Sequence, residues 1–153
     1  MAVPIERPYL AVASVLDEGP LSWLPAAGLA PDGHTSELGI GGPDGRVHRR
    51  VLVESGRAQA SGGGIAVPLS LRAVEHPERY PTLSGLLRLE PAGPASSSLR
   101  LDAEYVPPGG RLGAAADRAV LRRVAEASVR EFAVRVAERL ERGVRFRGRW
   151  DPA

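Results

Sequence analysis

The chain of 153 residues contains no cysteine, no lysine and no asparagine, and only seven of its residues are aromatic. The absence of cysteine excludes disulfides, thiolate metal sites and a cysteine nucleophile, and it is typical of cytoplasmic proteins. No apolar run reaches the roughly 18 residues of a membrane-spanning helix. The first residues also lack the basic start and apolar core of a secretory signal. We therefore expect a cytoplasmic protein without a transmembrane segment.

Positive charge comes from arginine alone, and it is evenly matched over most of the chain. The chain has 20 arginines and 18 acidic residues, which gives a formal net charge of +2. Residues 1–143 hold 17 arginines and 17 acidic residues, so the excess lies in residues 144–153, which contain Arg145, Arg147 and Arg149. A body without net charge does not indicate binding of nucleic acid. Length and composition predict one globular domain over residues 1–143 and a flexible Arg/aromatic tail over 144–153.

Short apolar or alternating segments separated by turn residues predict an antiparallel sheet of about seven strands. The last of them is the clearest, because Leu99, Leu101, Ala103 and Tyr105 alternate with residues that are mostly charged. Pro25 prevents a long regular helix between the first two strands, so residues 21–29 predict one or two short helical turns. The predicted strands are residues 9–16, 34–40, 46–54, 57–61, 65–74, 83–90 and 99–106.

One long C-terminal helix is predicted over residues 111–142. Pro107 and Pro108 cannot lie inside it and fix its beginning, and Gly143 is a natural C-terminal cap. Opposite charges four residues apart, such as Arg122 and Glu126, mark its outer face. The apolar face, which we expect to pack on the sheet, has spacings of three and four residues. Its members are Leu121, Val124, Ser128, Phe132, Val136 and Leu140.

Three segments in the second half of the chain resemble small bacterial members of the START-like superfamily, also called SRPBCC. They are Tyr80-Pro81-Thr82-Leu83-Ser84-Gly85, the stretch from Tyr105 to Gly113 that contains Pro107-Pro108-Gly109-Gly110, and Asp117 followed by Leu121-Arg122-Arg123-Val124-Ala125. The order of predicted elements is also that of the helix-grip fold. The resemblance implies an α+β fold in which a curved antiparallel sheet wraps around the C-terminal helix, with one or two short helices after the first strand. It transfers no catalytic residue.

The same resemblance implies a cavity between sheet and helix that binds a hydrophobic or amphipathic small molecule, such as a lipid or a polyketide-like compound. The inward positions offer an independent reason, because they are mostly medium and small side chains that do not fill a strongly curved sheet. The alternative is a sheet that collapses onto the helix and leaves no pocket. The predicted cavity residues are Trp23, Leu24, Arg49, Val67, Leu69, Leu71, Leu87, Leu101, Tyr105, Leu121, Val124 and Phe132.

The polar members of this set allow two interpretations each. Arg49 lies on the valine face of its strand, where it pairs with a ligand carboxylate or an interior acid, or else reaches solvent through its apolar stem. Tyr105 hydrogen-bonds a ligand, or it is a core residue with its hydroxyl at the rim. The three histidines share no metal-ligand spacing, so we expect neither a metal nor another cofactor.

Three functions follow as hypotheses. The first is binding of a hydrophobic small molecule. The second is a cyclase or hydratase in the same cavity, which needs an inward general acid or base that the predicted inward rows do not supply. The third is an interaction module in which the Arg/aromatic tail binds RNA or an anionic membrane. The sequence leaves open whether the protein is a monomer or a homodimer.

Overall fold

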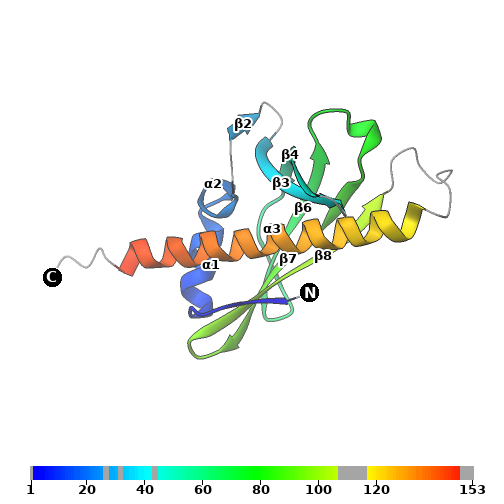
Figure 1. Cartoon of the computed structure of the whole chain (residues 1–153). Coiled ribbons are helices and arrows are strands. Elements are labelled where there is room, and N and C mark those ends of the chain that lie inside the picture. The colour runs from blue at the N-terminus through cyan, green and yellow to red at the C-terminus, as the bar shows by residue number, and fades with distance from the viewer. Residues whose placement is uncertain (1, 26–27, 31–32, 43–44, 107–116, 149–153) are drawn as a thin grey trace.

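The structure is a computed structural model, which describes residues 2–25, 28–30, 33–42, 45–106 and 117–148 (Figure 1). Its elements in chain order are β1 (Ala2–Ile5), α1 (Tyr9–Asp17), α2 (Pro20–Trp23), β2 (Gly28–Ala30), β3 (Gly33–Gly42), β4 (Gly45–Ser55), β5 (Gln59–Ser61), β6 (Gly64–Ala73), the 3-10 helix η1 (Pro77–Arg79), β7 (Thr82–Gly93), β8 (Ser96–Val106) and α3 (Asp117–Gly148).

A curved, open antiparallel sheet holds the long helix α3 across one face, as Figure 1 shows. The strand order is β1-β8-β7-β6-β4-β3-β2, and β5 pairs with β6 beside the end of β4. Pro68 lies where β4 gives way to β5, and the Gly56 N–H donates to the Pro68 carbonyl over 2.9 Å. Proline tolerates this position because no ladder bond needs its missing N–H. The predicted α+β helix-grip architecture is confirmed.

The first predicted strand, residues 9–16, is wrong, because this segment forms helix α1. Its buried residues are Val12, Ala13, Val15 and Leu16, which recur at the three- and four-residue spacing of a helix. A short apolar run does not distinguish a buried strand from a buried helix by periodicity alone. The first strand is instead Ala2–Ile5, which pairs antiparallel with β8. The two short helices therefore do follow the first strand.

The predicted end of the long helix is also wrong, because α3 continues through Gly143 to Gly148. Val144 packs against the hydrophobic core, so this part of the predicted tail belongs to the domain. Gly143 has a different role, since a Cβ added there would lie 2.7 Å from Val15 Cγ1. The glycine lets α1 approach α3 closely. Residues 107–116, which include Pro107 and Pro108, and residues 149–153 lie outside the described chain.

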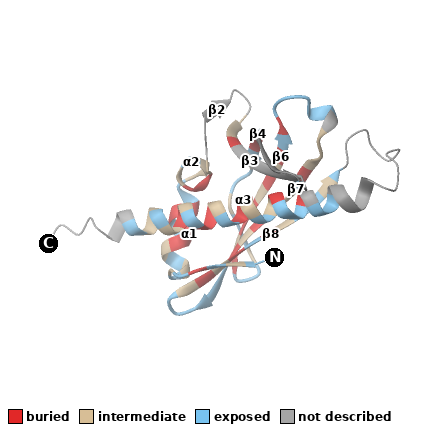
Figure 2. Ribbon diagram, in the orientation of Figure 1, coloured by how far each residue is buried: buried red, intermediate tan, exposed pale blue. Residues whose placement is uncertain are grey.

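The core lies between the sheet and α3, where the buried residues gather in Figure 2. Ser128, Phe132, Val136 and Leu140 of the predicted helix face are buried, together with three alanines that the stripe omitted, Ala125, Ala133 and Ala137. The C-terminal part of α3 is covered by the segment around α1, where the Glu6 N–H donates to Glu141 Oε1 over 3.1 Å. Trp23 and Leu24, at the end of α2, are also in this core.

Candidate functional site

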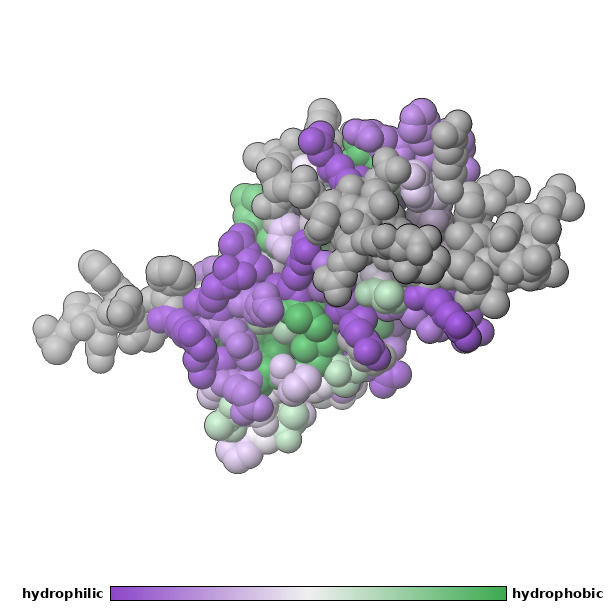
Figure 3. All heavy atoms as spheres, viewed as in Figure 1, coloured by the Kyte–Doolittle hydropathy of each residue, from purple (hydrophilic) through white to green (hydrophobic). Residues whose placement is uncertain are grey.

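An open groove of about 1130 Å³ runs between α3 and the last two strands. β7 and β8 supply its apolar floor, and α3 supplies a wall with a charged rim. Figure 3 shows apolar side chains gathered beside the middle of α3 and bordered by hydrophilic ones. The floor consists of Leu83, Leu101, Ala103 and Tyr105, and the wall of Arg122, Arg123, Ala125, Glu126, Ala127, Val129, Arg130, Glu131, Val134, Arg135 and Glu138.

The groove exists because small residues meet where the strands pass α3. Ala103 on β8 lies in the floor, and the helix contributes Ala125 and Ala127. Ala103 is paired with Gly85 on β7, where an added side chain would meet the β8 backbone and not the groove. Gly85 cannot gain a side chain without moving the sheet, since an added Cβ would overlap the Asp102 carbonyl. At the other end of α3, by contrast, side chains from α1 and α2 fill the space between helix and sheet. The hollow is therefore confined to the N-terminal two thirds of the helix.

The Tyr105 side chain ends this floor with an unsatisfied polar group. Its hydroxyl oxygen is buried and has no hydrogen-bond partner in the described part of the chain. Burial raises the pKa of the Tyr105 hydroxyl above its ordinary value. A buried hydroxyl without a partner costs about 1–3 kcal/mol. A ligand atom that accepts this hydrogen bond would recover that cost.

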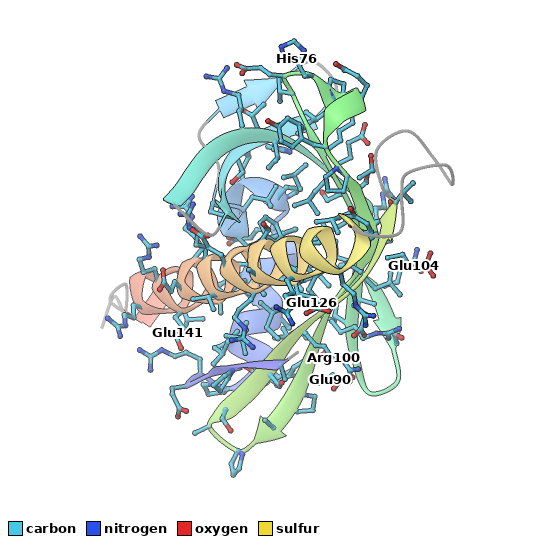
Figure 4. All side chains as sticks on the ribbon, turned by 45° about the vertical axis from the view of Figure 1, so that its right-hand side comes forward. His76, Glu90, Arg100, Glu104, Glu126 and Glu141 are labelled. Carbon is cyan, nitrogen blue, oxygen red and sulfur yellow. The ribbon has the colours of Figure 1, made fainter. Side chains whose placement is uncertain are left out.

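The charged rim is ordered by ion pairs one helical turn apart. Arg122 Nε lies 3.1 Å from Glu126 Oε1, and Arg135 Nη2 lies 2.7 Å from Glu131 Oε1. Figure 4 shows Glu126 on the side of α3 that faces the lower strands. We expected such pairs to mark the outer face of the helix. The Arg122–Glu126 pair is exposed, the Glu131–Arg135 pair is half-buried, and both border the groove. The four charged side chains of these pairs form part of the polar lining of the groove.

Two smaller hollows lie elsewhere. One, of about 530 Å³, is lined by residues of α1, α2, the β4–β5 connection and β6, among them Trp23, Arg57 and Val67. The other, of about 350 Å³, lies between Pro25 and the arginines Arg135, Arg139 and Arg142 of α3.

The predicted cavity residues separate into four groups. Leu101 and Tyr105 line the groove, whereas Trp23 and Val67 line the 530 Å³ hollow. Five are buried in the core and line none of the three hollows: Leu24, Leu69, Leu71, Leu87 and Phe132. The side chains of three more, Arg49, Leu121 and Val124, lie outside the described residues.

Several groove residues were missed by the sequence argument. Leu83 and Ala103 share the inward alternation of their strands, so the strand pattern contained the signal for them. Val129 and Val134 lie on α3 beside the predicted apolar stripe, not within it. No sequence signal identified them, because the rotation of a helix about its axis depends on what it packs against.

Outside the groove, chemistry-bearing residues are dispersed. His76 lies in an exposed loop far from α3 (Figure 4), with its Nδ1 3.4 Å from Glu78 Oε1. In the part of the chain that the structure describes, no three His, Asp or Glu side chains are grouped so that they could hold a metal ion. No helix among those residues is long and apolar enough to span a membrane.

Comparison with known proteins identifies the fold and no more. No protein-family model and no curated protein matches the chain. A solved structure described as a conserved protein from Geobacillus kaustophilus is similar, with a TM-score of 0.52 and 13% sequence identity. The similarity covers 92% of this chain and 93% of that one. At this identity the likeness supports the helix-grip architecture alone.

Proposed function

We propose that this protein binds a hydrophobic or amphipathic small molecule, a lipid or a polyketide-like compound, in the groove between α3 and β7–β8. The observation that carries the proposal is an apolar floor, Leu83, Leu101 and Ala103, that ends at the buried hydroxyl of Tyr105, for which the described residues supply no hydrogen-bond partner. Small-molecule sites typically combine an apolar lining with a few placed polar groups, in hollows of about 300–1,000 Å³. The groove, at about 1130 Å³, is slightly larger than that range.

The charges in the groove favour binding over catalysis. A general acid or base needs a pKa close to the working pH and access to the reacting proton. Two of the three lining glutamates, Glu126 and Glu131, are held in ion pairs with arginines. No histidine is among the described lining residues. Among the lining carboxylates, a cyclase or hydratase would therefore be left with Glu138.

The third hypothesis, a separate Arg/aromatic arm, loses part of its basis. Residues 144–148 belong to α3, and Val144 packs on the core. Membership of the START-like superfamily belongs to the proposal as well. It is supported by the helix-grip element order and the three sequence segments that resemble that superfamily.

Blocking the groove tests the proposal. Ala103 lies in the floor with an exposed side chain, so Ala103→Trp would fill the space that a ligand needs. We expect the wild-type protein to bind the neutral fluorophore N-phenyl-1-naphthylamine and Ala103→Trp to bind it at least tenfold more weakly at an unchanged melting temperature. Ala60→Trp is the matched control, because Ala60 is exposed on β5 and lines none of the three hollows.

The outcome that contradicts the proposal is equal probe binding by Ala103→Trp and the wild type. Mass spectrometry of an organic extract of the purified protein provides a second measurement. It should detect a co-purified apolar compound in the wild type and less of it in Ala103→Trp.

A further inference from the structure

We propose that the ligand of the groove is an anionic amphiphile, whose acidic head group lies at the Tyr105 end beside Arg123 and whose apolar tail extends past Leu101 toward Val134. This inference rests on the proposed function and adds the head-group chemistry and the orientation of the ligand. It depends on where the hydroxyl and the charges lie along the groove.

The Tyr105 hydroxyl and the first lining arginines share one end of the groove. Tyr105 is the penultimate residue of β8, and Arg122 and Arg123 lie in the second turn of α3. Figure 1 shows the C-terminal end of β8 next to the N-terminal end of α3. From Tyr105 toward the N-terminal end of β8, the next groove-lining side chains are those of Ala103 and Leu101. From Arg123 toward the C-terminal end of α3, the apolar lining residues are Val129 and Val134. A ligand with its head at Tyr105 thus has an apolar path for its tail.

Charge is distributed unequally along the same axis. The lining residues of the Tyr105 end are three arginines, Arg122, Arg123 and Arg130, and one glutamate, Glu126, for a net charge of +2. Farther along the helix the lining residues are Glu131, Arg135 and Glu138, for a net charge of −1. Each end has an intrahelical ion pair, and Arg130 also has a partner, so Arg123 is the cation on which an anion at the Tyr105 end depends. An anion is therefore favoured at the Tyr105 end and disfavoured at the other.

Apart from Glu126, which is paired with Arg122, the charged and hydroxyl groups that line this end are donors. The Tyr105 hydroxyl can donate to an oxygen anion, and hydrogen bonds to charged acceptors are about twice as strong as neutral ones. Arg123 lines the same groove from an exposed part of the helix, and a guanidinium suits the geometry of a carboxylate. A neutral alcohol would satisfy the hydroxyl but would gain nothing from the arginine, and a cationic head group would meet like charge. These comparisons select an acidic head group.

Three ten-carbon probes that differ only in head group test the inference. Decanoate, decanol and decyltrimethylammonium would compete with N-phenyl-1-naphthylamine, each below its micelle concentration and at low salt. We expect decanoate to bind at least tenfold more tightly than decanol, and decyltrimethylammonium to bind most weakly. The advantage of decanoate should decrease as salt is added, because the arginine rim is exposed to solvent.

Variants locate the head group. Arg123→Gln should weaken decanoate about three- to tenfold and leave decanol unchanged, and Tyr105→Phe should weaken decanoate more than decanol. Arg100→Gln is the matched control, since Arg100 is an exposed arginine of β8 that lines none of the hollows and pairs with Asp102 at 2.8 Å. It should leave both affinities unchanged.

The results separate this inference from the proposed function. Equal affinities for decanoate and decanol, tightest binding of decyltrimethylammonium, or an unchanged decanoate affinity in Arg123→Gln would overturn the acidic head group while ligand binding stands. If neither the fluorophore nor any of the three amphiphiles binds, both the inference and the proposed function are wrong.

Discussion

The close approach of α1 to α3 at Gly143 predicts that the effect of adding one methyl group there depends on Val15. A Cβ at position 143 would lie 2.7 Å from Val15 Cγ1 and 3.2 Å from its Cγ2. Carbon atoms pack best about 3.5–4.0 Å apart, so one helix must move by about 1 Å. Val15 cannot turn aside, because a β-branched side chain in a helix has one strongly preferred rotamer. Gly143→Ala therefore overpacks this contact.

The magnitude comes from two opposing terms. Overpacking a core contact costs about 1–3 kcal/mol, whereas replacing glycine by alanine inside a helix gains about 1 kcal/mol. The two partly cancel in the single variant. In a Val15→Ala background the two methyl groups that collide are absent, so only the gain remains. We expect the change in unfolding free energy caused by Gly143→Ala to differ by about 1–3 kcal/mol between the two backgrounds.

Urea unfolding followed by tryptophan fluorescence measures all four proteins of this cycle. Trp23 is only 1% exposed, so its emission reports the docked state of α2. Trp150→Phe, present in every variant, removes the second tryptophan signal. Val15→Ala will destabilise the protein by itself, since Val15 is buried, but the cycle subtracts that loss. The same effect of Gly143→Ala in both backgrounds would refute the close contact and, with it, the explanation of this glycine.

Two further predictions concern the core and the groove. Phe132 is fully buried, so Phe132→Ala should lower the free energy of unfolding in urea by about 3–5 kcal/mol, whereas Val134→Ala, two residues away on the exposed side, should change it by less than about 0.5 kcal/mol. Similar losses for both would contradict the orientation of α3. Burial raises the pKa of the Tyr105 hydroxyl, so its stabilising contribution is complete below the unfolded-state pKa and is lost as the pH rises through the folded-state pKa. Stability in alkali should therefore fall less steeply in Tyr105→Phe, and identical slopes would count against a desolvated hydroxyl.

The strand half of the fold was predictable because its signal is local. Each strand of the pair β7–β8 has one face on the core and one toward water, and this environment imposes alternation on residues 83–90 and 99–106. Ser128, Phe132, Val136 and Leu140 recur at helical spacing for the same reason. Two floor residues of the groove, Leu101 and Tyr105, followed from these patterns.

Tertiary packing decided the rest. Residues 9–16 form a helix because α3 and the sheet offer a surface on which Val12, Val15 and Leu16 are buried together, and a nine-residue helix is marginal by its own propensity. Gly143 predicts a helix end by its residue type, but α3 continues through it, and the glycine leaves room for Val15 of α1.

The location of the groove depends on the same packing. The sequence by itself determined that small and medium side chains face inward, and hence that space could remain between sheet and helix. It could not determine where, because α1 and α2 fill that space at one end of α3 while the small side chain of Ala103 leaves it open at the other. Which residues face a hollow is a property of the distances between elements, and those distances are set only when all the elements pack together.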